Sequence, residues 1–228
     1  MVKKVDLAFK CNFCDGGDEK GDKIFKSYCS EENMKQNVNS RRNIFCGYSS
    51  CNCKKVIDGE SNYEDLENRI HTEFICYESA LLEKWEIGAG RTKKGFKAKK
   101  FGKNIDLENR IAFLTTLQPN EKEKNRIVFG CFIIRNFNRG DSFVEGKISC
   151  LKNDTLKVEL SLSEADKIKF WDYYKCPKSP RKLWGTGLYR FLSKEQCVKI
   201  LNAMYKSTND LSKKQTIKEI LNYYTSLS

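Results

Sequence analysis

Six of the eleven cysteines in this 228-residue chain lie within its first 53 residues: Cys11, Cys14, Cys29, Cys46, Cys51 and Cys53. The first two form a Cys-x-x-Cys turn, which brings two thiolates to about the separation that a tetrahedral zinc ion requires. The later group can complete the shell from the other side of a small, loop-rich fold. This clustering therefore predicts that the N-terminal part of the chain folds around a metal ion.

Disulfide bonds are the main alternative to a metal site. The other five cysteines are scattered along the chain, and the total is odd. The N-terminus starts with a polar stretch and has no apolar core of secretory length, so we expect no signal peptide and a cytoplasmic, reducing location. In that compartment grouped cysteines are typical of metal ligands. Unrelated free thiols and redox chemistry are the remaining alternatives.

Two pairs of cysteines give the simplest set of four zinc ligands: Cys11, Cys14, Cys46 and Cys51. Cys53 could replace Cys51, and Cys29 could either join the shell or pack as a small apolar side chain. A shell made only of thiolates closes the ion off, whereas a catalytic zinc keeps one position open for water. We therefore expect the zinc to be structural.

Composition and chain length predict two parts. The hydrophobic fraction of 39% supports a packed core and argues against disorder. No apolar stretch approaches the roughly 20 residues of a membrane span, so we expect no membrane partner. Residues 1–60 form the cysteine-rich zinc-binding element, and residues 70–228 form the main domain, with a polar, acidic joint between them.

The main domain mixes strand and helix patterns, which predicts an α+β protein. Segments 111–116 and 126–134 are the clearest strands, because they are rich in β-branched and aromatic residues. Further strands are expected within 143–151 and 155–160, and helices over 30–38, 163–171, 193–204 and 213–224.

The charge balance favours an anionic partner. Lys and Arg number 42 against 30 Asp and Glu, a formal net charge of +12, and nucleic acid is the commonest partner of such a chain. Residues 91–103 hold seven basic residues and no acidic one: Arg91, Lys93, Lys94, Lys97, Lys99, Lys100 and Lys103. This glycine-containing segment predicts a mobile basic loop that lies along a phosphate backbone. A plain solvated loop is the alternative.

Large aromatic residues gather near glycine-rich turns. Four of them are candidates for the walls of a cage around one extruded base: Trp85, Trp171, Tyr173 and Trp184. A flipped base is held by stacking between rings while polar groups bind its edge, and Asp172 or Asn136 could supply those hydrogen bonds. Core packing is the alternative explanation for rings such as Phe170.

Nothing in the sequence positively supports catalysis. The chain has one histidine, His71, and lacks a Walker loop, a GxGxxG fingerprint, a GxSxG motif and a PD…ExK motif. Glu145, Glu159 and Asp172 give only a weak pattern for a nuclease. We therefore expect a binding module rather than an enzyme, with a metal-dependent nuclease as an alternative.

Residues 85–205 resemble the PUA-like superfamily, in particular its EVE and YTH branches. The resemblance rests on the strand patterns at 110–116 and 127–134, the mid-strand Gly130, and the later aromatic residues at 170–174. It implies a small β-barrel with flanking helices that binds a modified or flipped base in an aromatic cage. In bacteria such domains serve as sensors of modification-dependent restriction systems, joined to a nuclease or to an AAA+ GTPase of the McrB type.

These observations together predict a non-catalytic DNA-binding sensor that reads a modified base, methylated in the simplest case, and directs a restriction effector. The basic segment would bind phosphates, and the aromatic residues would hold the extruded base. An RNA-binding adaptor that contains zinc is a further alternative.

Overall fold

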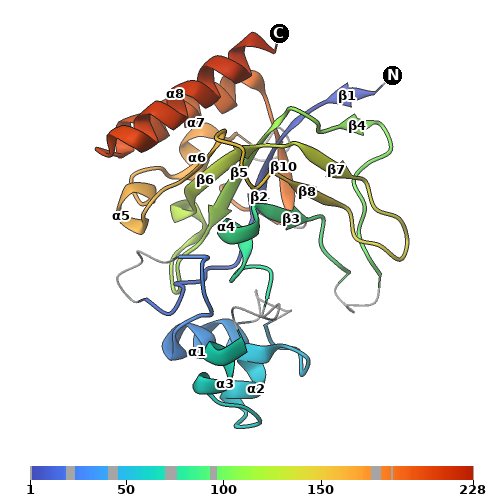
Figure 1. The fold of residues 1–228 in the computed structure, drawn as a ribbon, viewed down its shortest axis with the longest axis vertical. Coiled ribbons are helices and arrows are strands. Elements are labelled where there is room, and N and C mark those ends of the chain that lie inside the picture. The colour runs from blue at the N-terminus through green and yellow to red at the C-terminus, as the bar shows by residue number, and fades with distance from the viewer. Residues whose placement is uncertain are drawn as a thin grey trace. The chain divides into compact units, whose positions relative to one another are not determined.

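The computed structural model describes residues 2–18, 24–40, 46–69, 76–92, 97–175, 181–185 and 187–227. The chain divides into two compact units (Figure 1). The larger unit consists of Met1–Cys11 and Trp85–Ser228, and the smaller unit consists of Asn12–Lys84. This division differs from the predicted one, because the first eleven residues supply a strand to the larger unit and the smaller unit extends to residue 84.

A five-stranded sheet with the order β10-β2-β5-β6-β9 forms the centre of the larger unit. Its strands are β2 (Asp6–Lys10), β5 (Ile111–Thr116), β6 (Ile127–Ile133), β9 (Lys157–Glu159) and β10 (Tyr189–Leu192). All neighbouring strands are antiparallel except β2 and β5, which are parallel. Every residue of β5 and β6 is buried, which confirms the two clearest strand predictions and explains their uninterrupted apolar character.

Gly130 lets strand β6 lie close to its neighbour β9. A Cβ atom at this position would come within 2.9 Å of the carbonyl oxygen of Val158 on β9, closer than real Cβ contacts allow. The chain therefore needs a residue without a side chain in the middle of an otherwise bulky, apolar strand. The loop between β5 and β6 contains a short 3₁₀ turn, η1 (Glu123–Asn125), and the two strands pair antiparallel as a hairpin.

The remaining described strands form two smaller sheets. One has the order β3-β8-β7, with β3 (Glu86–Gly88), β8 (Lys147–Ser149) and β7 (Asn136–Asn138), and the other pairs β1 (Lys3–Lys4) with β4 (Ile105–Asp106). The α+β class is therefore confirmed. Within the described residues the strands form three separate sheets, and no closed barrel is found among them.

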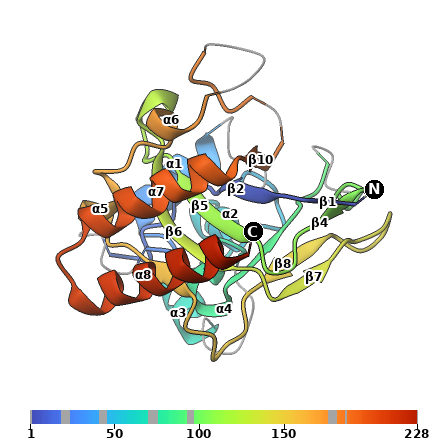
Figure 2. The ribbon, with the colours of Figure 1, turned by 90° about the horizontal axis from the view of Figure 1, so that it is seen from above.

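Four helices accompany the large sheet: α5 (Leu162–Ala165), α6 (Phe170–Tyr173), α7 (Lys194–Ser207) and α8 (Leu211–Ser226). Ser193 and Gln196 form a capping box at the start of α7, as the sequence pattern predicted. Figure 2 shows α7 and α8 side by side, and α8 also contacts strand β9. The helix predicted over 163–171 is instead two short helices, α5 and α6. No described helix has the length and apolar character to cross a membrane.

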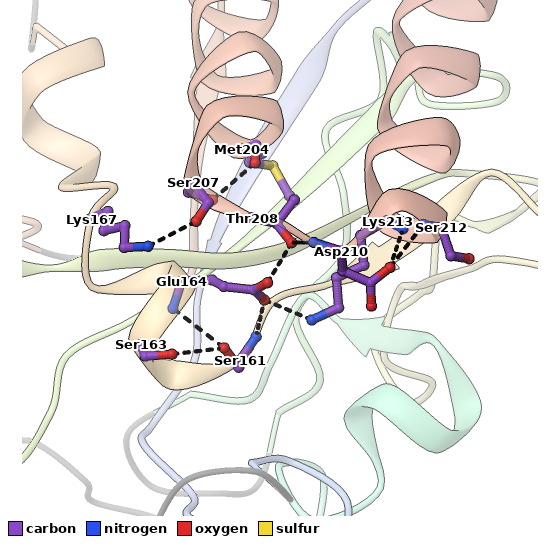
Figure 3. Close-up of polar contacts among 10 residues, drawn as sticks. All are labelled: Ser161, Ser163, Glu164, Lys167, Met204, Ser207, Thr208, Asp210, Ser212 and Lys213. Atoms are coloured by element: carbon purple, nitrogen blue, oxygen red, sulfur yellow. Dashed lines mark hydrogen bonds and ion pairs between the residues drawn. The ribbon is translucent and has the colours of Figure 1, made fainter.

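Glu164 on α5 fastens the turn between α7 and α8 (Figure 3). Its carboxylate accepts hydrogen bonds from the Ser161 amide at 2.8 Å and from the Thr208 hydroxyl, and it pairs with the Lys213 ammonium at 2.6 Å. Burial alone would raise the pKa of Glu164, but the ammonium and the two hydrogen bonds outweigh it and lower the pKa to about 2. The group therefore stays ionised at neutral pH.

Asp6 connects the first strand of the sheet to the last helix. Its side chain is 2% exposed and forms an ion pair with Arg110. The carboxylate also accepts hydrogen bonds from the Ile111 amide at 3.1 Å and from the Tyr224 hydroxyl at 2.6 Å. The network therefore joins β2, the start of β5 and α8 across more than 200 residues of sequence.

The described part of the smaller unit contains four short helices: α1 (Glu31–Asn39), α2 (Asn52–Ile57), α3 (Tyr63–Arg69) and α4 (Leu81–Lys84). Ser30 caps α1, which confirms the helix predicted there. The buried amides of Asn33 and Asn37 donate to the carbonyl oxygen of Phe13 at 3.3 and 2.8 Å. The loop that follows β2 is therefore held against α1 by hydrogen bonds.

Candidate nucleic-acid interface and thiol cluster

The two described ends of the basic segment pair with each other. Arg91 forms an isolated antiparallel bridge with Ala98, and the amide of Lys99 donates to the carbonyl oxygen of Gly90 at 2.8 Å. We call residues 90–100 the basic hairpin. The sequence predicted a mobile loop here, whereas the structure pairs its two ends through backbone hydrogen bonds.

The cations of this segment are available to an outside partner. Arg91, Lys97, Lys100 and Lys103 are exposed and Lys99 is half-buried, and none of the five forms an ion pair with a residue that the structure describes. Lys93 and Lys94, which were also predicted to contact phosphates, lie outside the described residues, as does His71.

The loop of residues 139–146 holds the basic hairpin in place. Its last residue, Gly146, donates to the carbonyl oxygen of Lys99 at 2.9 Å and accepts from the amide of Ala89 at 2.7 Å. The buried carboxylate of Glu145 accepts from the amide of Gly90. Glu145 was one of the acids in the nuclease hypothesis, and here it anchors the hairpin.

The structure brings together two of the three predicted tryptophan walls. Trp171 and Trp184 have ring centroids 6.3 Å apart, and Phe170 lies 5.2 Å from each of them. Both indoles are buried, at 4% and 1% exposure. Trp85 belongs to a different group, because it is also buried and packs against Phe132 at 6.0 Å.

Asp172 and Tyr173, which follow Trp171 and were also predicted to line the base pocket, are not buried with the two tryptophans. Asp172 is exposed and pairs with Lys182 at 3.1 Å, and Tyr173 is half-buried. Asn136, the other candidate for an edge hydrogen bond, lies on β7 and donates to the Ser149 hydroxyl at 3.2 Å.

Two arginines that the sequence analysis did not single out flank Trp184. The guanidinium carbons of Arg126 and Arg190 lie 5.0 and 5.2 Å from the ring centroid, within the range of cation–π attraction. The indole N–H of Trp184 donates to the carbonyl oxygen of Gly187 at 3.0 Å. We call Phe170, Trp171, Tyr174 and Trp184 with these two arginines the aromatic–arginine cluster. Only the fold brings residue 126 to residue 184, so local sequence carries no signal for it.

Two buried donors in this cluster have no hydrogen-bond partner among the described residues. They are Nη1 of Arg126 and Nε1 of Trp171. Arg126 is 1% exposed, and its other guanidinium nitrogens are taken by Glu123 at 2.6 and 3.2 Å. Buried donors in native proteins are nearly always paired. Both N–H groups are therefore available to donate a hydrogen bond to a ligand that carries acceptor atoms.

The basic hairpin contacts the segment that leads out of the cluster. The Leu188 side chain lies directly over Gly90, where a Cβ atom would overlap it. Leu188 also accepts a hydrogen bond from the Lys10 amide at 2.7 Å, which fixes it beside strand β2. One segment of the larger unit, residues 187–190, therefore leads from the cluster to the start of the basic hairpin.

The smaller unit gathers cysteine thiols around Cys29. The Cys14 and Cys53 thiols are near enough to Cys29 to shift its pKa: Cys14 and then burial raise the pKa well above its usual range, and Cys53 lowers it. Cys53 in turn raises the pKa of Cys51. The Cys14 thiol donates to the carbonyl oxygen of Ser27 at 3.3 Å. We call Cys14, Cys29, Cys51 and Cys53 the thiol cluster, and all ten described cysteines are free thiols.

Two further thiols lie within electrostatic range of this cluster. Burial, and then the charge of Glu78, raise the pKa of Cys76 to about 12, and the same two causes raise the pKa of Cys46. Among the residues that the structure describes, no group of three or more His, Cys, Asp or Glu side chains has the arrangement of a formed metal site. The predicted zinc therefore stays a prediction.

The four predicted zinc ligands are divided between the units. Cys14, Cys46 and Cys51 belong to the smaller unit, whereas Cys11 ends the strand segment of the larger unit. The Cys11 amide donates to the carbonyl oxygen of Thr115 on β5 at 2.8 Å, so its backbone is part of the sheet. Cys29 and Cys53, which were the named substitutes, are in the thiol cluster.

No family model, no curated protein and no solved structure matches this chain. The resemblance to PUA-like domains therefore stays a prediction, and a function has to be inferred from the residues themselves.

Proposed function

We propose that this protein is a non-catalytic DNA-binding module that grips phosphates with the basic hairpin and holds one extruded base in the aromatic–arginine cluster. The observation that carries the proposal is the contact of Gly90, which begins the basic hairpin, with Leu188, which follows Trp184 by four residues. Phosphate contacts position a protein on DNA, whereas contacts to a base supply specificity. A single nucleotide offers both groups within a short distance.

The phosphate step rests on unpaired positive charge. A cation that already pairs with a carboxylate gains little from a phosphate, because the old pair has to break. The five described cations of residues 91–103 have no such pair to break. Backbone pairing of the hairpin also reduces the conformational entropy that the segment loses on binding.

The base step rests on rings and donors in the same place. Stacking on an aromatic ring stabilises a bound base by about 1–3 kcal/mol. The free N–H groups of Arg126 and Trp171 match the carbonyl and ring-nitrogen acceptors on the edges of bases. Because these rings are buried, the cluster has to open when the base enters. A modified, methylated base and a PUA-like relationship are retained as parts of this proposal, with a nuclease or AAA+ GTPase as the effector.

A structural zinc in the smaller unit completes the proposal. Cys29 neighbours Cys14 and Cys53, and Cys53 neighbours Cys51. These four thiols, which form no disulfide bonds, have the composition of a Cys₄ zinc site. We assign the ligands to Cys14, Cys29, Cys51 and Cys53 in place of the set with Cys11 and Cys46. Small shifts of these side chains would be needed for tetrahedral geometry.

Replacing Lys97, Lys99 and Lys100 by alanine should weaken DNA binding to every sequence. The loss of three phosphate contacts should lower the slope of log K against log salt by about 2–3. Binding of a fluorescent duplex, measured by anisotropy at several salt concentrations, gives both quantities. The matched control removes three exposed lysines from α7 and α8, Lys194, Lys206 and Lys218, and should leave the slope unchanged.

The same assays contain the outcomes that contradict the proposal. If the two triple variants weaken DNA binding equally, the basic hairpin is not a specific phosphate-binding site, and the protein binds DNA only through its overall positive charge. Cleavage of plasmid in the presence of Mg²⁺ or Mn²⁺ would overturn the non-catalytic part. Tighter binding of RNA than of DNA at fixed salt would favour the adaptor alternative.

Removing the free indole donor should erase discrimination between bases without unfolding the protein. Trp171→Phe keeps a smaller ring in the cluster and removes a donor that has no partner among the described residues. The smaller ring leaves a cavity, so the fold of the variant is checked by its unfolding midpoint. Affinity is measured across duplexes that carry different methylated bases at fixed salt, and we expect the wild type to prefer one of them about tenfold or more. The variant should bind all of them alike, with its salt slope intact. If the wild-type protein binds all of these duplexes with equal affinity, the proposal that it recognises a modified base is wrong.

A further inference from the structure

Phe143 is the most exposed large apolar side chain described in the larger unit. It lies at the tip of the 139–146 loop with 87% of its surface exposed, and Val144 beside it is 53% exposed. An exposed aromatic ring costs free energy in water, and no described aromatic residue stacks on it. Its position therefore suggests contact with something outside the chain.

The tip that carries Phe143 has a fixed backbone conformation. The carboxylate of Asp141 accepts hydrogen bonds from the amides of Phe143 and Val144, both at 2.7 Å. The Asp141 amide donates back to the carbonyl oxygen of Val144 at 2.8 Å, which closes the turn. A ring presented on such a turn loses little backbone entropy when it inserts into a partner.

The neck of the loop is narrowed by two glycines. Gly140 has a φ of +78°, and a Cβ atom there would overlap the backbone of Gly146. A Cβ atom at Gly146 would in turn overlap the carbonyl oxygen of Arg139. The two sides of the loop thus pass each other at contact distance, which makes the neck narrow. We call residues 139–146 the finger.

Two lysines of the basic hairpin lie beside this finger. The amide of Gly146 donates to the carbonyl oxygen of Lys99, so the basic hairpin runs alongside the neck. Hydrogen bonds from the amides of Val144 and Phe143 lower the pKa of Asp141 at the tip, and the positive charge of Lys100 lowers it further without forming an ion pair. The Asp141 carboxylate is therefore engaged by the amides of its own turn, and the apolar ring is the group that faces outward.

We infer that Phe143 is a wedge that stacks against a base, inserted between two base steps of the DNA whose phosphates the basic hairpin binds. Proteins that bend DNA insert apolar side chains between base steps in this way, next to Lys and Arg contacts to the backbone. The inference rests on the proposed DNA binding, and it adds a second, separate contact to the bases. Opening the stack at one step also assists the extrusion of a neighbouring base, which the aromatic–arginine cluster would hold.

Phe143→Ala should weaken binding of duplex DNA roughly tenfold, the effect of losing one stacked base, with an unchanged salt slope. A duplex with 2-aminopurine reports the insertion directly, because the probe brightens when its stack opens. We expect brightening with the wild type and with Phe143→Trp, and none with Phe143→Ala. Leu211→Ala removes another side chain that is 80% exposed and should change neither readout.

The outcomes separate this inference from the proposal beneath it. If the lysine variant weakens binding while Phe143→Ala retains full affinity and full brightening, DNA binding stands and the wedge is wrong. If the wild-type protein binds no DNA, both fail. If wild-type protein instead binds anionic phospholipid vesicles and Phe143→Ala does not, while DNA affinity is equal in the two, the ring serves a membrane surface and the wedge is overturned.

Discussion

Removing zinc from the full chain should unfold helices α1 and α2 of the smaller unit and leave the five-stranded sheet of the larger unit intact. Structural zinc sites with thiolate ligands supply about 10–16 kcal/mol of apparent binding free energy at neutral pH, and that energy is folding energy. Amide hydrogen exchange before and after chelation measures the effect on residues 31–39 and 111–116 separately. Exchange should become fast only in the first range.

Single cysteine variants identify the ligands. Elemental analysis of the purified chain should find one zinc per molecule, and Cys29→Ser or Cys53→Ser should lose it. Cys11→Ser should keep the zinc, because that residue belongs to the sheet segment of the larger unit. Cys150→Ser, which changes a buried thiol far along the chain in the larger unit, is the matched control. If the purified protein contains no metal, and if its amide hydrogen exchange is the same with and without a chelator, the zinc site is disproved.

Replacing Asp6 by alanine should lower the free energy of unfolding of the larger unit by about 3 kcal/mol. The substitution leaves the Arg110 guanidinium, whose side chain is 14% exposed, without its counter-charge in a poorly solvated place. It also removes the acceptor of the Ile111 amide and of the Tyr224 hydroxyl. Denaturant unfolding followed by tryptophan fluorescence measures this change, since all three tryptophans lie in this unit.

Two further variants show whether the charge pair is responsible. Tyr224→Phe removes the hydrogen bond that the hydroxyl donates to the Asp6 carboxylate and the one that it accepts from Arg110 at 3.4 Å, and it should cost about 1.5–3 kcal/mol. Glu195→Ala breaks an exposed pair with Lys199 and should leave the unfolding midpoint where it was. If Asp6→Ala is as stable as Glu195→Ala, the network does not hold the sheet to α8.

Local sequence patterns were sufficient where one face or one cap decides the structure. The apolar, β-branched segments became β5 and β6, and the Ser193 capping box became the start of α7. These signals act over a few residues, so no distant contact is needed to read them. The cysteine-rich N-terminal segment could also be identified, because the spacing of cysteines is visible in the sequence.

The candidate site was predicted only in part. The cations of residues 91–103 were visible as a charge run, and two of the three tryptophans do lie together. The arginines that flank Trp184 were not found, because Arg126 and Arg190 are distant in sequence and have no common pattern. Phe143 was missed as well, since a single phenylalanine in a strand-like stretch gives no sign of exposure.

Strand β2 shows the limit of the local reading most clearly. Its residues lie at the front of the cysteine-rich segment, and their place is between β10 and β5, whose sequences begin more than 100 residues later. A parallel pair needs a long connection between its strands, so no turn signal marks it. Here that connection includes the entire smaller unit, which moved the real boundary to residues 11 and 85.

One hexapeptide separates what the sequence determined from what the tertiary structure decided. Asp-Leu-Glu-Asn-Arg-Ile occurs at 65–70 and at 106–111. Its first five residues are helical in α3, whereas the second copy leaves β4, turns at Asn109 with a φ of +60°, and enters β5. Identical local preferences thus gave opposite conformations. Propensity differences of under 1 kcal/mol per residue yield to the burial of Ile111 in the sheet and to the ion pair of Arg110 with Asp6.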